Sequence, residues 1–180
     1  MNKKEIKAKV SELLSSGTAK AEVFAQLSGQ GIKDYQLAYF IASYPNPIRC
    51  DQQSGKVNVL IAIMSIQAVL AFLGGYAIGT EIGPNAKWII SFLLAVIPLL
   101  FAWGFYRNRM GAYNGYIALS IIQLLPKVLE FFTLNPTIAS VDIAISIGLI
   151  AYVWYVREKI FPGFLFMTPK KANGSYIFVE

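Results

Sequence analysis

Five polar side chains that interrupt apolar stretches of this 180-residue chain are its candidates for chemistry. Lys127, Glu130 and Asp142 carry charge, and Gln123 and Gln67 carry amides that donate and accept hydrogen bonds. A charge in apolar surroundings is costly, so such groups usually pair with one another or face a wet cavity. Carboxylates beside an ammonium group therefore predict either a proton or ion relay or a polar binding spot.

The spacing of these residues predicts that most of them share one surface. In the third apolar stretch, polar residues recur at steps of four and three, the repeat of one helix face. They are Tyr116, Ser120, Gln123, Lys127 and Glu130. Asp142 lies early in the next stretch, at a similar depth near the outer side if consecutive stretches are antiparallel helices.

A structural interpretation of the same residues stays open. In it, Lys127 snorkels outward and pairs with Glu130, three residues further on, while Asp142 caps the next helix. Gln67 either joins this network or forms a hydrogen bond between two helices.

The residue types that are missing exclude most catalytic chemistry. The chain has no histidine, which removes the commonest general base and the most usual transition-metal ligand. It has no phosphate-binding loop, no dinucleotide fingerprint, no GxSxG and no HExxH motif. Its single cysteine, Cys50, forms no disulfide within the chain. We therefore expect a protein that is not an enzyme and binds neither a metal nor a cofactor.

Four long apolar stretches must position the polar side chains. They cover residues 57–79, 88–106, 112–134 and 138–156, and 56% of the chain is apolar. A helix needs about 20 residues to cross ~30 Å of hydrocarbon, and continuous rather than alternating runs favour helices over a barrel. The sequence predicts an all-α membrane protein whose residues 57–160 form a four-helix transmembrane bundle.

The basic residues predict how the chain is threaded. Of 16 lysines and arginines, 14 fall on one side of the predicted spans, and only Lys87 and Lys127 fall on the other. Lys and Arg are retained in the cytoplasm, so we expect a bacterial inner-membrane protein with both termini cytoplasmic. The net charge of +6 favours anionic lipid headgroups as partners over nucleic acid.

Small residues predict where helices approach closely, because packing in lipid depends on them. Two ladders recur at four-residue spacing, one in the first stretch and one in the fourth. Their members are Ala71, Gly75 and Gly79, and Ser140, Ala144 and Gly148. We expect both ladders to face neighbouring helices, either within the bundle or, for Gly75 and Gly79, in a homodimer.

Polar segments precede and follow the four apolar stretches in the sequence. Residues 1–50 predict a cytoplasmic module of three short helices, which we expect to dock a protein partner or to cover the bundle. In the tail, residues 161–180, the pair Asn173 and Gly174 predicts the turn of a short hairpin. A lone hairpin is marginally stable in water, so we expect it to pack on the N-terminal module.

The order of segments along the whole chain resembles that of one group of known proteins. A helical head, "EVFAQLSGQGIKDYQLAYFIASYPNP", precedes four apolar stretches, then "REKIFPGF" and a polar tail. In this the chain resembles the small four-span inner-membrane proteins of Gram-negative bacteria, some of which act as immunity proteins against the toxin of a related cell.

Two functions remain as expectations from the sequence. The first is a non-catalytic multi-pass inner-membrane protein that acts by protein–protein interaction, as an immunity or accessory factor. The alternative is a small oligomeric channel, or a proton- or ion-linked conduit, built on the outer polar cluster.

Overall fold

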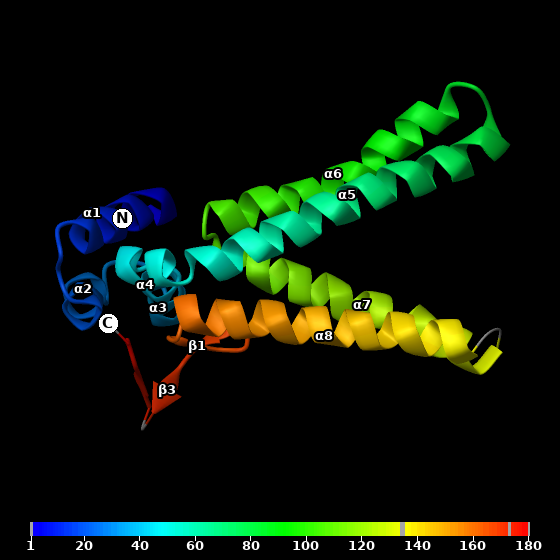
Figure 1. The fold of residues 1–180 in the computed structure, drawn as a ribbon. Coiled ribbons are helices and arrows are strands. Elements are labelled where there is room, and N and C mark those ends of the chain that lie inside the picture. Colours follow the sequence, from blue (N-terminus) through cyan, green and yellow to red (C-terminus); the bar gives the residue numbers. More distant parts are fainter. Residues whose placement is uncertain (1, 134–135, 173, 180) are drawn as a thin grey trace. The chain divides into compact units, whose positions relative to one another are not determined.

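The computed structural model describes residues 2–133, 136–172 and 174–179, apart from the side chains of residues 130, 133 and 138. These residues are mostly helical, with short strand pairs near the C-terminus (Figure 1). The chain divides into two compact units: unit 1 contains Met1–Asp51 and Arg157–Glu180, and unit 2 contains Gln52–Val156. The C-terminal tail therefore belongs to the same compact unit as the N-terminal helices.

Long helices form unit 2, and the last of them continues into unit 1. They are α5 (Ser54–Ile82), α6 (Ala86–Tyr106), α7 (Met110–Thr133) and α8 (Pro136–Ile160). Within the described residues, three segments are long and apolar enough to cross a membrane: Ser54–Ile82, Ala86–Tyr106 and Ala139–Ile160. Helix α7 covers the third predicted stretch but is not one of the three. The side chains of residues 130 and 133 in α7 lie outside the described residues, to which the three segments are confined.

Helices α5 and α6 lie side by side as an antiparallel pair (Figure 1). Gly83 ends α5 with a φ of 157°, and the chain reverses before α6 begins at Ala86. Phe72 of α5 contacts Trp88 and Phe92 of α6, with ring centroids 6.5 and 5.3 Å apart. Apolar rings and close backbone contact thus hold this pair together.

The turn from α6 to α7 is equally tight. Asn108 adopts a left-handed conformation with a φ of 47°, which asparagine tolerates better than most residues. Gly104 of α6 packs directly against the Cβ of Ala112 in α7. Beyond the turn, Phe105 lies 4.8 Å from Tyr113 between ring centroids, which fixes the beginning of α7 against the end of α6.

In unit 1, short helices enclose a small apolar core. They are α1 (Lys3–Ser15), α2 (Lys20–Leu27) and α3 (Asp34–Ala42). Helix α4 (Pro47–Gln52) follows them and buries none of its residues. The core consists of Ile6, Val10, Val23, Leu27, Leu37 and Ile41. The backbone N–H of Asn2 donates to the Glu5 carboxylate at 2.9 Å, which caps α1. The sequence predicts three short helices in residues 1–50, and α4 is a fourth helix, which begins at Pro47.

The tail forms two short antiparallel strand pairs that pack on the head. β1 (Phe164–Leu165) pairs with β2 (Thr168–Pro169), and β3 (Lys171–Ala172) pairs with β4 (Ser175–Tyr176). Asn173, in the predicted turn, lies outside the described residues, and Gly174 beside it has a φ of 80°. The ring of Phe24 in α2 lies 5.4 Å from the rings of both Tyr176 and Phe178. These contacts hold the tail against α2.

Candidate binding site

An ion pair links α7 to α8 in unit 2. The Nζ of Lys127 lies 2.8 Å from one carboxylate oxygen of Asp142 and donates to the other at 2.9 Å. It also donates to the Oγ of Ser146 at 2.9 Å. Asp142 and Ser146 are one turn apart on α8, so one ammonium group meets both. The side chains of Lys127 and Asp142 remain 30% and 52% exposed, so the pair lies at an opening rather than in a closed core.

A second polar group lies on the same face of α7, closer to the N-terminal end of the helix. The phenol of Tyr116 is within hydrogen-bonding reach of Ser120 on its own helix and of Gln67 on α5. Tyr116 is 8% exposed, and Phe101 packs edge-on against its ring at 5.3 Å between centroids. Helix spacing thus places Tyr116 and Ser120 together, and α5 supplies the partner amide.

A cavity of about 370 Å³ joins these two groups. All four long helices line it, and every lining residue belongs to unit 2. Its polar lining consists of Gln67, Tyr116, Ser120, Gln123, Lys127, Asp142 and Ser146. Its apolar lining includes Leu94, Ile97 and Leu149. Binding sites for small molecules commonly combine a mostly apolar wall with a few polar groups, so the cavity suits an amphipathic guest.

Most of the predicted polar residues come together here. Lys127, Asp142, Gln123 and Gln67 all line the cavity. The side chain of Glu130 lies outside the described residues, so its predicted pairing with Lys127 is not addressed; the described partner of Lys127 is Asp142. Ser146 is a member that the sequence analysis missed. Its position four residues after Asp142, on the same helix face, was the available signal.

The predicted ladder in α5 meets α6. A Cβ built on Gly75 would lie 2.7 Å from the Cα of Ser91, and one built on Gly79 would collide with the backbone of Lys87. Only glycine allows the two backbones to approach so closely. Ala71, one turn earlier, lines the cavity instead.

The predicted ladder in α8 behaves differently. Ser140, Ala144 and Gly148 are all exposed, and a Cβ on Gly148 would meet no heavy atom within 4 Å. The expectation that this ladder faces a neighbouring helix of the chain is therefore wrong for the described residues. The reason is that α8 turns Asp142 and Ser146 towards α7, which leaves the small residues on another face.

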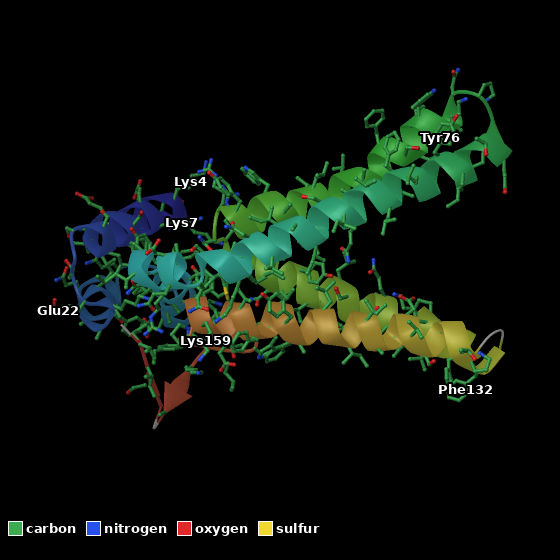
Figure 2. The ribbon with its side chains drawn as sticks, in the orientation of Figure 1. Lys4, Lys7, Glu22, Tyr76, Phe132 and Lys159 are labelled. Atoms are coloured by element: carbon green, nitrogen blue, oxygen red, sulfur yellow. The ribbon has the colours of Figure 1, made fainter. Side chains whose placement is uncertain are left out.

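Cations contact aromatic rings at both ends of unit 2. At one end, Lys56 lies 4.9 Å from the ring centroid of Tyr155, and Arg109 lies 4.5 Å from that of Trp103. At the other end, Lys87 lies 5.3 Å from the ring of Tyr76, which Figure 2 labels near the turn between α5 and α6. Aromatic rings with nearby lysines and arginines are typical of the two membrane–water interfaces.

Unit 1 holds the perturbed groups outside these long apolar segments. Burial raises the pKa of the Tyr39 phenol, Tyr35 raises it further, and the Arg157 guanidinium opposes the rise. Burial also raises the pKa of the Cys50 thiol, which disfavours its reactive thiolate. Among the described residues, no three His, Cys, Asp or Glu side chains gather as a metal site would require. These features indicate structural roles for both residues.

Comparison with known proteins returns no match: no protein-family model, no curated protein and no solved structure is similar to this chain.

Proposed function

We propose that this protein is a non-catalytic, multi-pass membrane protein that acts by binding a membrane-resident partner in the cavity of unit 2. The observation that supports this proposal is the polar lining of the cavity, with the Lys127–Asp142 pair at its opening. A polar group inside a membrane protein is expensive unless it is satisfied or used. Seven polar side chains line this one space.

The membrane arrangement that we propose has four spans, α5 to α8, with both termini in the cytoplasm of a bacterial cell. The split of basic residues supports this orientation. The cation–ring contacts support the position of the two interfaces along the helices, with Lys56 and Arg109 at one and Lys87 at the other. In this arrangement α7 crosses the membrane with its polar face turned to the cavity.

Unit 1 would then lie on the cytoplasmic side. Helix α1 carries exposed lysines, of which Figure 2 labels Lys4 and Lys7. Lysines near a membrane surface gain about 1 kcal/mol each from anionic lipids. We propose that unit 1 both contacts anionic headgroups and docks a protein partner, in an immunity or accessory role. Leu165 and Ile177 of the tail, 68% and 43% exposed, offer apolar contacts for that partner.

Photo-crosslinking tests the role of the cavity directly. A photoreactive amino acid is placed at Leu149, which lines the cavity, and as a control at Ile147, which is 54% exposed and is not among the lining residues. We expect irradiation of cells to join a specific adduct to the protein from Leu149 and not from Ile147. Equal adducts from both positions would overturn the proposal.

A second function is favoured by the spread of polar residues along α7. Tyr116, Ser120, Gln123 and Lys127 span three turns of one face, which suits an ion- or proton-linked conduit in an oligomer. Purified protein in liposomes would then dissipate a proton gradient, and Lys127→Met would change the rate. If liposomes that contain a high density of the protein keep their proton gradient, the result would support the binding function instead.

A further inference from the structure

We infer that the cavity of unit 2 holds the headgroup of a zwitterionic phospholipid that carries a phosphate and a primary ammonium, as in phosphatidylethanolamine. This inference rests on the proposed binding function and names the ligand of that site. The inference is based on three groups that lie together at the opening of a cavity with apolar walls: the ammonium of Lys127, the carboxylate of Asp142 and the hydroxyl of Ser146.

Charge balance favours a zwitterion. The charged side chains of the described lining are Lys127 and Asp142, one of each sign and paired with one another. A purely anionic guest would pair with Lys127 and leave the Asp142 carboxylate facing like charge. A purely cationic guest would leave the Lys127 ammonium unpaired. A guest with both charges exchanges one ion pair for two and leaves neither side chain uncompensated.

The pair is able to make that exchange. Lys127 and Asp142 are partly exposed at the opening of the cavity, so a bound molecule can reach both members of the pair. When the pair opens, Lys127 donates to phosphate oxygens in place of the carboxylate. In the structure, the hydroxyl oxygen of Ser146 accepts a hydrogen bond from Lys127. The hydroxyl hydrogen of Ser146 can therefore donate to the same phosphate. Two donors on adjacent helices thus converge on the phosphate.

Hydrogen bonding selects a primary ammonium over a quaternary one. The Asp142 carboxylate only accepts hydrogen bonds, and a primary ammonium offers three donors whereas a choline group offers none. Quaternary ammonium groups are instead recognised by cages of aromatic rings. The described lining has only Phe101 and Tyr116 as aromatic members, and neither is next to Asp142 in sequence or on the same helix.

Depth and shape agree with a lipid source. Lys127 lies six residues before the end of α7 and Asp142 six residues after the start of α8, which is about 9 Å along each helix. That depth suits a headgroup drawn slightly into the membrane. The apolar residues Leu94, Ile97 and Leu149 offer a wall for the first carbons of the acyl chains.

Lipid retention measured by native mass spectrometry tests the inference. Purified protein is equilibrated with an equal mixture of phosphatidylethanolamine, phosphatidylcholine and phosphatidylglycerol that carry the same acyl chains. We expect selective retention of phosphatidylethanolamine. Lys127→Met and Asp142→Asn should each reduce it by about tenfold, the loss expected for a charge-assisted hydrogen bond. Lys87→Met removes an outer-side cation away from the cavity lining and is the matched control, with retention unchanged.

The outcomes separate this inference from the proposed function. Equal retention of the three lipids, or retention unchanged in Lys127→Met, overturns the inference. A preference for phosphatidylglycerol assigns the cavity to an anion and overturns it as well. Soluble phosphoethanolamine is added as a competitor, and full displacement at micromolar concentration would assign the same chemistry to a free solute and overturn the lipid. If Leu149 crosslinks to a polypeptide and the protein retains the three lipids equally, the lipid inference is overturned but the proposed binding function stays in place.

Discussion

Replacing Gly75 by alanine tests the packing of α5 on α6 most sharply. The added Cβ would lie 2.7 Å from the Cα and 2.9 Å from the backbone N of Ser91. Carbon atoms rest about 3.5–4.0 Å apart, so the helices must separate by about 0.8 Å or more. Both opposing atoms are backbone, so no side chain can rotate away.

The size of the effect follows from that displacement. A gap of about 0.5–1 Å forfeits roughly a quarter to a half of the dispersion energy of each contact that it opens. Overpacking of this kind typically costs about 1–3 kcal/mol. We expect Gly75→Ala to destabilise the protein by that amount. Gly79→Ala should cost at least as much, because its Cβ collides with the backbone of Lys87.

Gly74 provides the matched control in the same helix. A Cβ on Gly74 meets no heavy atom within 4 Å. Alanine is a better helix former than glycine by roughly 0.5–1 kcal/mol, so Gly74→Ala should leave stability unchanged or raise it slightly. Thermal unfolding in detergent, followed by circular dichroism, measures all three variants.

Two results would refute the reasoning. If Gly75→Ala is as stable as Gly74→Ala, the close contact between α5 and α6 does not exist. If Gly75→Ala instead dissociates an oligomer and leaves the thermal stability of the monomer intact, the glycine face binds a second copy, as the homodimer interpretation requires.

The other predictions concern both units. Lys127→Met should destabilise the protein by about 0.6–2 kcal/mol. Adding Asp142→Asn should restore stability, because both members of the described ion pair are then neutral. Thermal unfolding of the single and double variants checks this, and an equal loss in both would contradict it. Because burial raises its pKa, the Cys50 thiol should react with iodoacetamide more slowly at pH 8 in the native protein than in denaturant; equal rates would count against that burial. Phe178→Ala should cost about 1–3 kcal/mol, since Phe178 packs on the core of unit 1, and its neighbour Val179→Ala should cost little; proteolysis of the tail compares them.

Periodicity in the sequence accounts for much of the fold and for most of the site. Steps of four and three place Tyr116, Ser120, Gln123 and Lys127 on one face of α7, and the structure has them lining one cavity. The same spacing places Gly75 and Gly79 on one face of α5, which packs on α6. These inferences work because a residue's position on a helix depends only on its distance along the chain.

Contacts between helices are less accessible from the sequence. The rotation of α8 about its own axis decides whether Asp142 and Ser146 or the ladder of Ala144 and Gly148 faces α7, and both faces look equally suited to packing. The Lys127–Asp142 pair settles that choice in favour of the polar face. That the tail packs on the head follows from the general argument that a lone hairpin needs support. Which residue makes the contact does not follow, because no local pattern marks Phe178 as the one that meets the core of unit 1.

Cysteine accessibility offers the most direct test of a polar, outward-opening cavity inside a membrane protein. In a Cys50→Ser background, Ser146→Cys puts a thiol in the cavity lining, and Ile147→Cys puts one on a neighbouring exposed apolar position outside that lining. Thiols react as thiolates, which form in water and not in hydrocarbon. The account predicts that a charged, membrane-impermeant thiol reagent added outside intact cells labels Ser146→Cys and leaves Ile147→Cys unmodified. Labelling of both positions, or of neither, would contradict it.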